Sequence, residues 1–290
     1  MSNLDALFWQ VDEFCQSFEP QWHQQQLLDN PNRRQRRRRL SLSEIMTLLI
    51  AYHQSDYRCF KQFYLKHVCC FWRQEFPLLV SYYRFVEWMP STVVPLYIYL
   101  RSCFGRCSGI SFIDATSLRV CHNRRIHSHR ALSSLAARGK TSVGWFYGFK
   151  LHLVINHKGE LLECCLTPGN TDDRHPTPQL LSSLFGKVFA DKGYISHKLA
   201  QALRHKLGIQ LITRIRRNMN NQLMLMSDKL LLRHRGVIES VIEQLKNCCN
   251  IEHSRHRSPA NFMVNLLSGL IAYCHKPNKP SLDLNAFTLP

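Results

Sequence analysis

The sequence of 290 residues lacks an apolar run of the roughly 18 residues that a membrane-spanning helix requires. Its first residues, MSNLDALFWQVDEF, carry acids and no basic cluster, which is unlike a secretion signal. It also lacks a long basic amphipathic helix of the kind that binds membrane surfaces. With 45% hydrophobic residues, we expect a soluble cytoplasmic protein with one large domain or two modest ones.

Motifs for nucleotide cofactors and for zinc are also missing. There is no G-x-G-x-x-G and no P-loop. The 12 cysteines fall as adjacent pairs and scattered singles, without any C-x-x-C. Cys103 and Cys107 have a tolerable spacing but no matching pair downstream, and His122, His127 and His129 lie in a basic run. We expect reduced, mostly buried thiols and no structural zinc.

Acidic residues are few. The chain has 20 Asp and Glu against 38 Lys and Arg, which gives a net charge of +18. Such an excess opposes compaction and is typical of a protein with a polyanionic partner, nucleic acid first and an anionic membrane surface second. A carboxylate placed on an apolar strand in so basic a chain therefore needs an explanation.

Residues 1–108 are predicted to form a helical, DNA-binding domain. Ser41 and Glu44 have the spacing of a capping box at the start of a helix, and a second amphipathic stretch follows after a short polar break. Two short helices across such a break could form a helix-turn-helix. The alternative is a helical bundle with a solvated basic loop. The DNA-binding interpretation rests mainly on the run that includes Arg36, Arg37, Arg38 and Arg39.

From residue 109 the pattern changes to strands that alternate with helices. Three consecutive strands predict an antiparallel meander, and later strands separated by helices must join it in parallel. The result is an α/β domain over 109–276, a ribonuclease-H-like mixed sheet flanked by helices, with an irregular tail over 277–290. The predicted strands lie at 109–121, 145–155, 160–169, 187–191 and 209–215, and the predicted helices begin near 171, 193, 230 and 259.

Two aspartates interrupt or end apolar strands of this predicted sheet. Asp114 is flanked by Phe112, Ile113 and Ala115, and an ionised acid left unpaired there is costly. Asp191 ends the strand KVFAD, where open sheets place their ligands. Each alone could be structural, as a bonded buried acid or as a turn former. If the strands are neighbours, the two acids could share a divalent cation.

A third acid lies on the predicted helix RGVIESVIEQLK. Glu239 has Arg235 four residues before it and Lys246 seven after it, so the three share one stripe. Such a stripe could equally be a solvated, salt-bridged face. Glu243, one turn further on, is the obvious rival for a functional role.

Together the motifs FIDATS, FADKGY and R-x-x-x-E-x-x-x-x-x-x-K resemble the catalytic signature of bacterial insertion-sequence DDE transposases. The tyrosine often found three residues before the arginine is absent, since Leu232 stands there. The resemblance implies that Asp114, Asp191 and Glu239 form a metal-binding catalytic triad. It also favours Glu239 over Glu243.

The chemistry fits these residue types. Hard oxygen donors suit Mg²⁺, for which Mn²⁺ can substitute, and two ions about 4 Å apart can promote in-line displacement at phosphorus. The resemblance implies that Arg235 and Lys246 hold phosphates, and Lys150 and His152 are weaker candidates for DNA contacts. Trp145 could stack on a displaced base, or it could pack in the core or against a hairpin.

The expected function is that of a transposase, localised with the bacterial nucleoid. It would bind the terminal inverted repeats of its element, hydrolyse a strand at each end and join the 3′-hydroxyl to target DNA. Joining two ends of double-stranded DNA predicts a homodimer. The alternatives are a DNA-binding protein derived from a transposase and a ribonuclease-H-fold nuclease without strand transfer.

Overall fold

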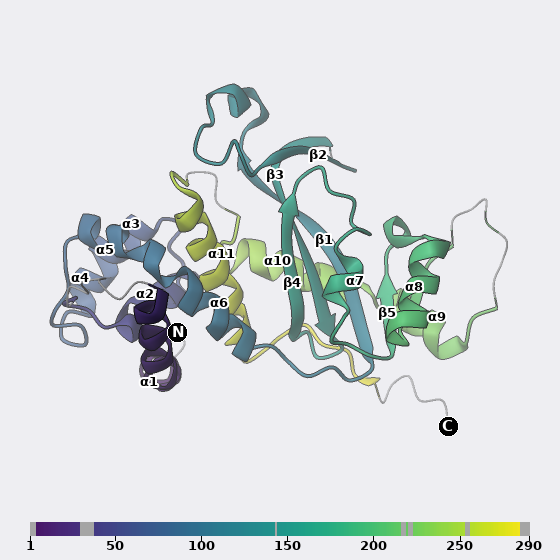
Figure 1. The fold of residues 1–290 in the computed structure, drawn as a ribbon, viewed down its shortest axis with the longest axis horizontal. Coiled ribbons are helices and arrows are strands. Elements are labelled where there is room, and N and C mark those ends of the chain that lie inside the picture. Colours follow the sequence, from purple (N-terminus) through teal and green to yellow (C-terminus); the bar gives the residue numbers. More distant parts are fainter. Residues whose placement is uncertain are drawn as a thin grey trace. The chain divides into compact units, whose positions relative to one another are not determined.

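The structure, a computed structural model, describes residues 4–29, 38–142, 144–215, 219, 223–252 and 256–284. Contacts divide the chain into two compact units (Figure 1). A helical unit comprises residues 1–103, 247–251 and 257–275, and a sheet unit comprises residues 104–246, 252–256 and 276–290. No helix in the described parts of the chain is long and apolar enough to cross a membrane.

The described part of the helical unit consists of helices and turns, as the sequence predicted, and its longest helix has 26 residues. Its elements are α1 (Leu4–Asp29), α2 (Leu42–His53), α3 (Phe60–Gln62), a π-helical turn (Phe63–Val68), α4 (Cys69–Phe71), α5 (Tyr82–Trp88), a 3-10 turn (Met89–Thr92), α6 (Val93–Ser102) and α11 (Pro259–Cys274). The capping box at α2 is confirmed, because the Glu44 N–H donates to Ser41 Oγ at 3.0 Å and the Ser41 N–H donates to the Glu44 carboxylate at 2.6 Å.

Helix α11 belongs to the helical unit by its contacts. It packs against α2 and α6, and Ser258 caps it by accepting a hydrogen bond from the Asn261 N–H at 3.2 Å. The sequence-based boundaries had assigned this helix to the domain over 109–276. The difference has a physical reason: most of its residues from Leu266 to Tyr273 are buried, and the helices able to cover them lie at the other end of the chain.

The sheet unit has a mixed, curled sheet with the strand order β2-β3-β1-β5-β6, and β4 pairs with β3. Strand β3 runs antiparallel to β1, β2 and β4, whereas β5 runs parallel to both β1 and β6. This is the ribonuclease-H-like arrangement predicted from the order of elements. The strands are β1 (Ile110–Cys121), β2 (Ala137–Thr141), β3 (Gly144–Asn156), β4 (Leu161–Pro168), β5 (Lys187–Ala190) and β6 (Gln210–Thr213).

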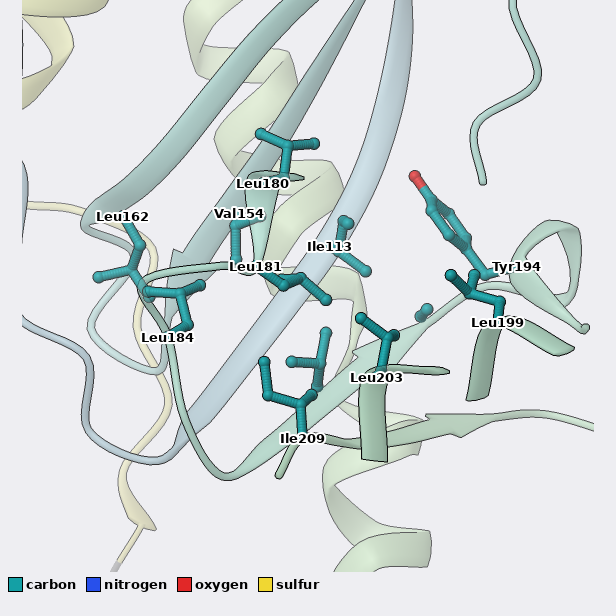
Figure 2. Packing of buried hydrophobic residues seen from close by; sticks show 12 residues of the cluster. Ile113, Val154, Leu162, Leu180, Leu181, Leu184, Tyr194, Leu199, Leu203 and Ile209 are labelled. Atoms are coloured by element: carbon teal, nitrogen blue, oxygen red, sulfur yellow. The ribbon is translucent and has the colours of Figure 1, made fainter. Parts of the chain in front are cut away.

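Helices cover both faces of this sheet. One face packs against α7 and α8 through an apolar cluster that includes Ile113, Val154, Leu181 and Leu203, with Tyr194 at its edge (Figure 2). Helix α10 runs behind the strands, on the side away from that cluster (Figures 1 and 2). The helices are α7 (Thr177–Leu180), α8 (His197–Leu207), α9 (Met226–Arg233) and α10 (Gly236–Asn247), with 3-10 turns at Asn123–Ser128 and Lys192–Tyr194.

Two predicted helices differ from those observed. The helix expected from Thr171 onward is only the short α7, because Asp172 forms a turn in which its carboxylate and carbonyl accept from the N–H groups of Arg174 and His175. The helix expected to begin near residue 230 is instead two helices, α9 and α10, which are separated by His234 and Arg235. Strand β2, which lies between the strands predicted at 109–121 and 145–155, was missed. The chain from residue 277 to 283 is irregular, as expected.

Candidate active site

The parallel pairing of β1 and β5 brings two aspartates level with each other. Phe112 pairs with Phe189, so two positions further along each strand Asp114 lies level with Asp191. Because side chains alternate along strands, both acids project from the sheet face that Phe112 and Phe189 occupy. Strand β5 ends at Ala190 while β1 continues, so the two acids lie at the end of the parallel pairing, where such sheets bind ligands.

Helix α10 and the residue before it complete this group. Arg235 Nη1 donates to Asp114 Oδ2 at 3.2 Å, and its Nη2 donates to Glu239 Oε1 at 2.7 Å. The same Nη2 lies 3.7 Å from Asp191 Oδ1. All three predicted acids thus contact one guanidinium, and Glu239 is one helical turn from it. Glu243 is exposed and is not among the acids that contact Arg235, so this geometry favours Glu239.

The three acids differ in their exposure to solvent. The side chain of Asp114 is 22% exposed, compared with 51% for Asp191 and 62% for Glu239. Burial raises the pKa of Asp114, while the Ala115 N–H and the Arg235 guanidinium oppose this rise and the neighbouring Asp191 adds to it. The first acid is therefore held inside the sheet and the other two reach solvent. A charged ligand could therefore reach this group of acids from the side of Asp191 and Glu239.

The three carboxylates are ligands that suit a hard divalent cation, although in this structure all three contact Arg235. Carboxylate oxygens are the ligands that Mg²⁺ prefers. In the described part of the chain, no three His, Cys, Asp or Glu side chains are placed so that they could together hold one ion. The positive charge at the site comes from Arg235 instead. Asp114, Asp191 and Glu239 could hold a divalent ion if the guanidinium moved aside.

Comparison with known proteins agrees with this geometry. Residues 104–259, more than half of the chain, match the family described as a transposase DDE domain. The chain belongs to the DDE transposase family. The match begins at the first residue of the sheet unit and ends at the first residue of α11. No individual curated protein matches the sequence.

The basic side chains predicted to bind DNA have partners within the DDE transposase domain. Lys246 Nζ donates to the Ser117 carbonyl at 2.7 Å and pairs with Glu252 at 3.2 Å. Lys150 Nζ donates to the Thr171 carbonyl at 2.8 Å and to Asp173 at 2.9 Å. DNA would have to compete for both ammonium groups.

His152 does not fit the role predicted for it. Its side chain is fully buried and shares a hydrogen bond of 2.8 Å with the Thr167 hydroxyl. Burial, opposed by the charge of Asp173 and assisted by that of Lys150, lowers the pKa of His152 to about 4. A neutral, buried imidazole cannot bind a phosphate, so we do not propose His152 as a DNA contact.

The arginine run is only partly described. Arg36 and Arg37 lie outside the described residues. Arg38 donates to Ser91 Oγ at 2.8 Å and lies 5.8 Å from the centre of the Trp88 ring. Arg39 is exposed to solvent.

A pocket of about 450 Å³ opens beside β2 and the loop after β4. Its lining includes Arg138, Lys140, Trp145, Lys150 and Asp173, together with Gly193 from the turn that follows the second acid. The Trp145 side chain is 61% exposed and Lys140 Nζ lies 5.7 Å from its ring centre. Trp145 therefore does not pack in the core, whereas packing against a hairpin fits its pairing with Lys140 across β2 and β3.

Sequence reasoning missed two residues beside the acids, Asp173 and Tyr194. Asp173 follows a second aspartate in a turn, and nothing in that spacing distinguishes it from a helix cap. Tyr194 belongs to the FADKGY motif, so proximity to Asp191 was the available signal. Its ring packs at the edge of the apolar cluster, while its hydroxyl is buried without a hydrogen-bond partner among the described residues.

Proposed function

We propose that the chain is the transposase of an insertion sequence. It binds the terminal inverted repeats of its element, hydrolyses the DNA strand at each end and joins the freed 3′-hydroxyl to target DNA. The observation that carries this proposal is the convergence of Asp114, Asp191 and Glu239 on one guanidinium within a DDE transposase domain.

The three acids would hold two divalent ions, Mg²⁺ or Mn²⁺. When bound, such ions would supply activation of the attacking oxygen and stabilisation of the leaving oxygen in an in-line displacement. Arg235 compensates the acids in the DNA-free protein. It would then turn to a DNA phosphate, which replaces the carboxylates as its anionic partner. Lys246, on the same helix, would add a second phosphate contact.

The neighbouring pocket would guide the DNA strand past the acids. Arg138 and Lys140 supply positive charge for phosphates, and the exposed Trp145 ring offers a surface on which an unpaired base can stack. The arginines before α2 would contact the DNA of the element ends. Bringing two such ends together requires two catalytic sites, so we propose a homodimer on paired ends.

One reaction tests the proposal and separates it from its alternatives. The full chain is incubated with Mg²⁺, a supercoiled target plasmid and labelled DNA that carries the terminal repeats flanking its own coding segment. Cleavage at the ends followed by covalent joining to the plasmid is the expected result. Cleavage without joining would indicate a nuclease, and end binding without cleavage would indicate a DNA-binding protein derived from a transposase.

A dimer of the chain is tested on the same DNA. Sedimentation of the complex with two repeat-bearing ends should give two protein chains per paired end. One chain per end, with ends that do not associate, would contradict the proposed assembly while leaving the cleavage result intact.

A further inference from the structure

The Tyr194 hydroxyl is a buried donor beside the acids. Tyr194 is 2% exposed, and its oxygen has no hydrogen-bond partner among the described residues. The 3-10 turn ties it to the second acid, since the Tyr194 N–H donates to the Asp191 carbonyl at 3.0 Å. A buried hydroxyl without a partner destabilises a folded protein, so its retention needs an explanation.

The hydroxyl faces away from the apolar cluster and is influenced by the charges of the acids. Leu199 and Leu203 pack in the same apolar cluster as the ring, and the oxygen is at the end of the ring that points away from them (Figure 2). Burial, and then the nearby charges of Asp114, Asp173 and Asp191, keep the pKa of Tyr194 well above its usual value. The hydroxyl therefore stays protonated and available to donate.

In this state Asp114 is hydrogen-bonded without the tyrosine. Asp114 accepts from its neighbouring Ala115 N–H at 2.9 Å and from Arg235 at 3.2 Å, so both of its oxygens already have partners. A divalent cation at the acids would repel the guanidinium and remove one of these donors. A neutral hydroxyl is not repelled, and carboxylates that bind metals usually accept such hydrogen bonds from a second layer of residues.

We propose that Tyr194 is a positioning residue that donates to Asp114 once a divalent cation displaces Arg235. This inference rests on the proposed function, because it requires the acids to hold the cation. Tyr194 contacts neither DNA nor the reacting atoms. It replaces the hydrogen bond that Asp114, the least exposed of the three acids, no longer receives once Arg235 has moved away.

The experiment measures Mn²⁺ binding by the full chain without DNA, with free Mn²⁺ followed by electron paramagnetic resonance. Tyr194→Phe should bind Mn²⁺ about 10- to 100-fold more weakly than the wild type. The Tm of the metal-free variant should be unchanged or higher, because the removed hydroxyl has no partner in that state. Tyr64→Phe is the matched control. Its hydroxyl donates to the Val80 carbonyl at 2.6 Å, so this variant should lower Tm without weakening Mn²⁺ binding.

Asp114→Asn separates failure of this inference from failure of the proposed function. If Asp114→Asn loses Mn²⁺ binding while Tyr194→Phe binds as tightly as the wild type, the role of Tyr194 is overturned and the metal site stands. A lower Tm for metal-free Tyr194→Phe would also overturn it, since the hydroxyl would then have a partner already. If the wild type shows no binding that depends on Asp114, the metal site itself is wrong and the inference falls with it.

Discussion

Arg235 Nη1 lies 3.2 Å from Asp114 Oδ2, although the two residues are 121 positions apart in the chain. This contact joins the first strand of the sheet to the start of α10. The arginine side chain is only 12% exposed, so the pair is shielded from solvent far more than a surface salt bridge. The same guanidinium contacts two further acids, which makes Arg235 the internal counter-charge of the whole site.

Glu239→Gln should separate binding from catalysis. The substitution keeps the shape of an exposed side chain and removes its charge, so end binding should be retained. Mg²⁺-dependent cleavage should fall by at least about 100-fold, since even residues that only support metal ligands contribute about 10- to 100-fold. Rates of cleavage and Kd for end DNA are measured in parallel. Glu243→Gln is the matched control one turn away, and loss of cleavage there with activity retained in Glu239→Gln would reassign the role.

Arg235→Ala should destabilise the metal-free protein. Removal of the guanidinium leaves the largely buried Asp114 carboxylate without its positively charged partner, which should lower the free energy of unfolding by about 1–3 kcal/mol. Because Arg235 pairs with Asp114 only when that carboxyl is ionised, this part of the loss should shrink as the pH falls and Asp114 becomes protonated. Urea denaturation at pH 7 and pH 5 measures both effects. Arg233→Ala, an exposed arginine on α9, should cause no comparable loss.

Much of the site could be predicted because local signals and topology agree. The hairpin between β3 and β4 follows from Asn156 and Gly159: the asparagine side chain accepts from two turn N–H groups, and the glycine has a φ of +71°. The sequence placed Asp114 and Asp191 on two strands but left open whether those strands are neighbours. The observed parallel register confirms that they are.

Interactions between distant segments could not be predicted in the same way. Strand β2 crosses the end of β4 where Gly139 and Gly169 meet so closely that a Cβ on either would clash with the other segment, a relation that no local pattern encodes. The turn at Asp172 replaced a helix because side chain and backbone both satisfy its N–H groups. That Arg235 reaches all three acids depends on where α10 docks, which periodicity alone leaves open.

His152 should make stability depend on pH. Its pKa is about 4 in the folded protein against an ordinary value of 6.5. As the pH falls from 6.5 toward 4, the unfolded chain takes up a proton that the folded protein does not, so the free energy of unfolding decreases. The His152→Gln variant can keep a hydrogen bond to Thr167. Between pH 7.5 and pH 5, its free energy of unfolding should fall by about 2 kcal/mol less than that of the wild type. The measurement is urea denaturation at both pH values.

The control for this pH effect is His127→Gln, which changes an exposed histidine. Its unfolding should follow the wild-type pH dependence. Asp114 acts in the opposite direction, because its raised pKa lets the folded protein take up a proton first. Since Asp114 is present in every variant, the difference between them isolates His152. Equal pH dependence in the wild type and His152→Gln would mean that the imidazole is not held neutral.

The arginines before α2 should dominate the salt dependence of end binding. If about six phosphates are contacted in all, affinity should fall by roughly 10³-fold between 50 and 200 mM salt. Replacement of Arg36, Arg37 and Arg39 by Ser should reduce the logarithmic salt slope by up to about 0.9 for each phosphate that the variant no longer neutralises. Arg38 is left in place, because its bond to Ser91 gives it a structural role. Fluorescence anisotropy with end DNA and with unrelated DNA provides both slopes.

Point substitutions test this region more cleanly than removal of the helical unit, because α11 packs against α2 and α6 and would lose its apolar cover in a truncated chain. The matched control replaces Lys66 and Arg73, two exposed basic residues of the same unit. If the arginine run recognises the element ends, the triple variant should lose more affinity for end DNA than for unrelated DNA, and the control should lose little of either. Equal losses on both DNAs would place sequence recognition in the sheet unit and leave the arginines a purely electrostatic role.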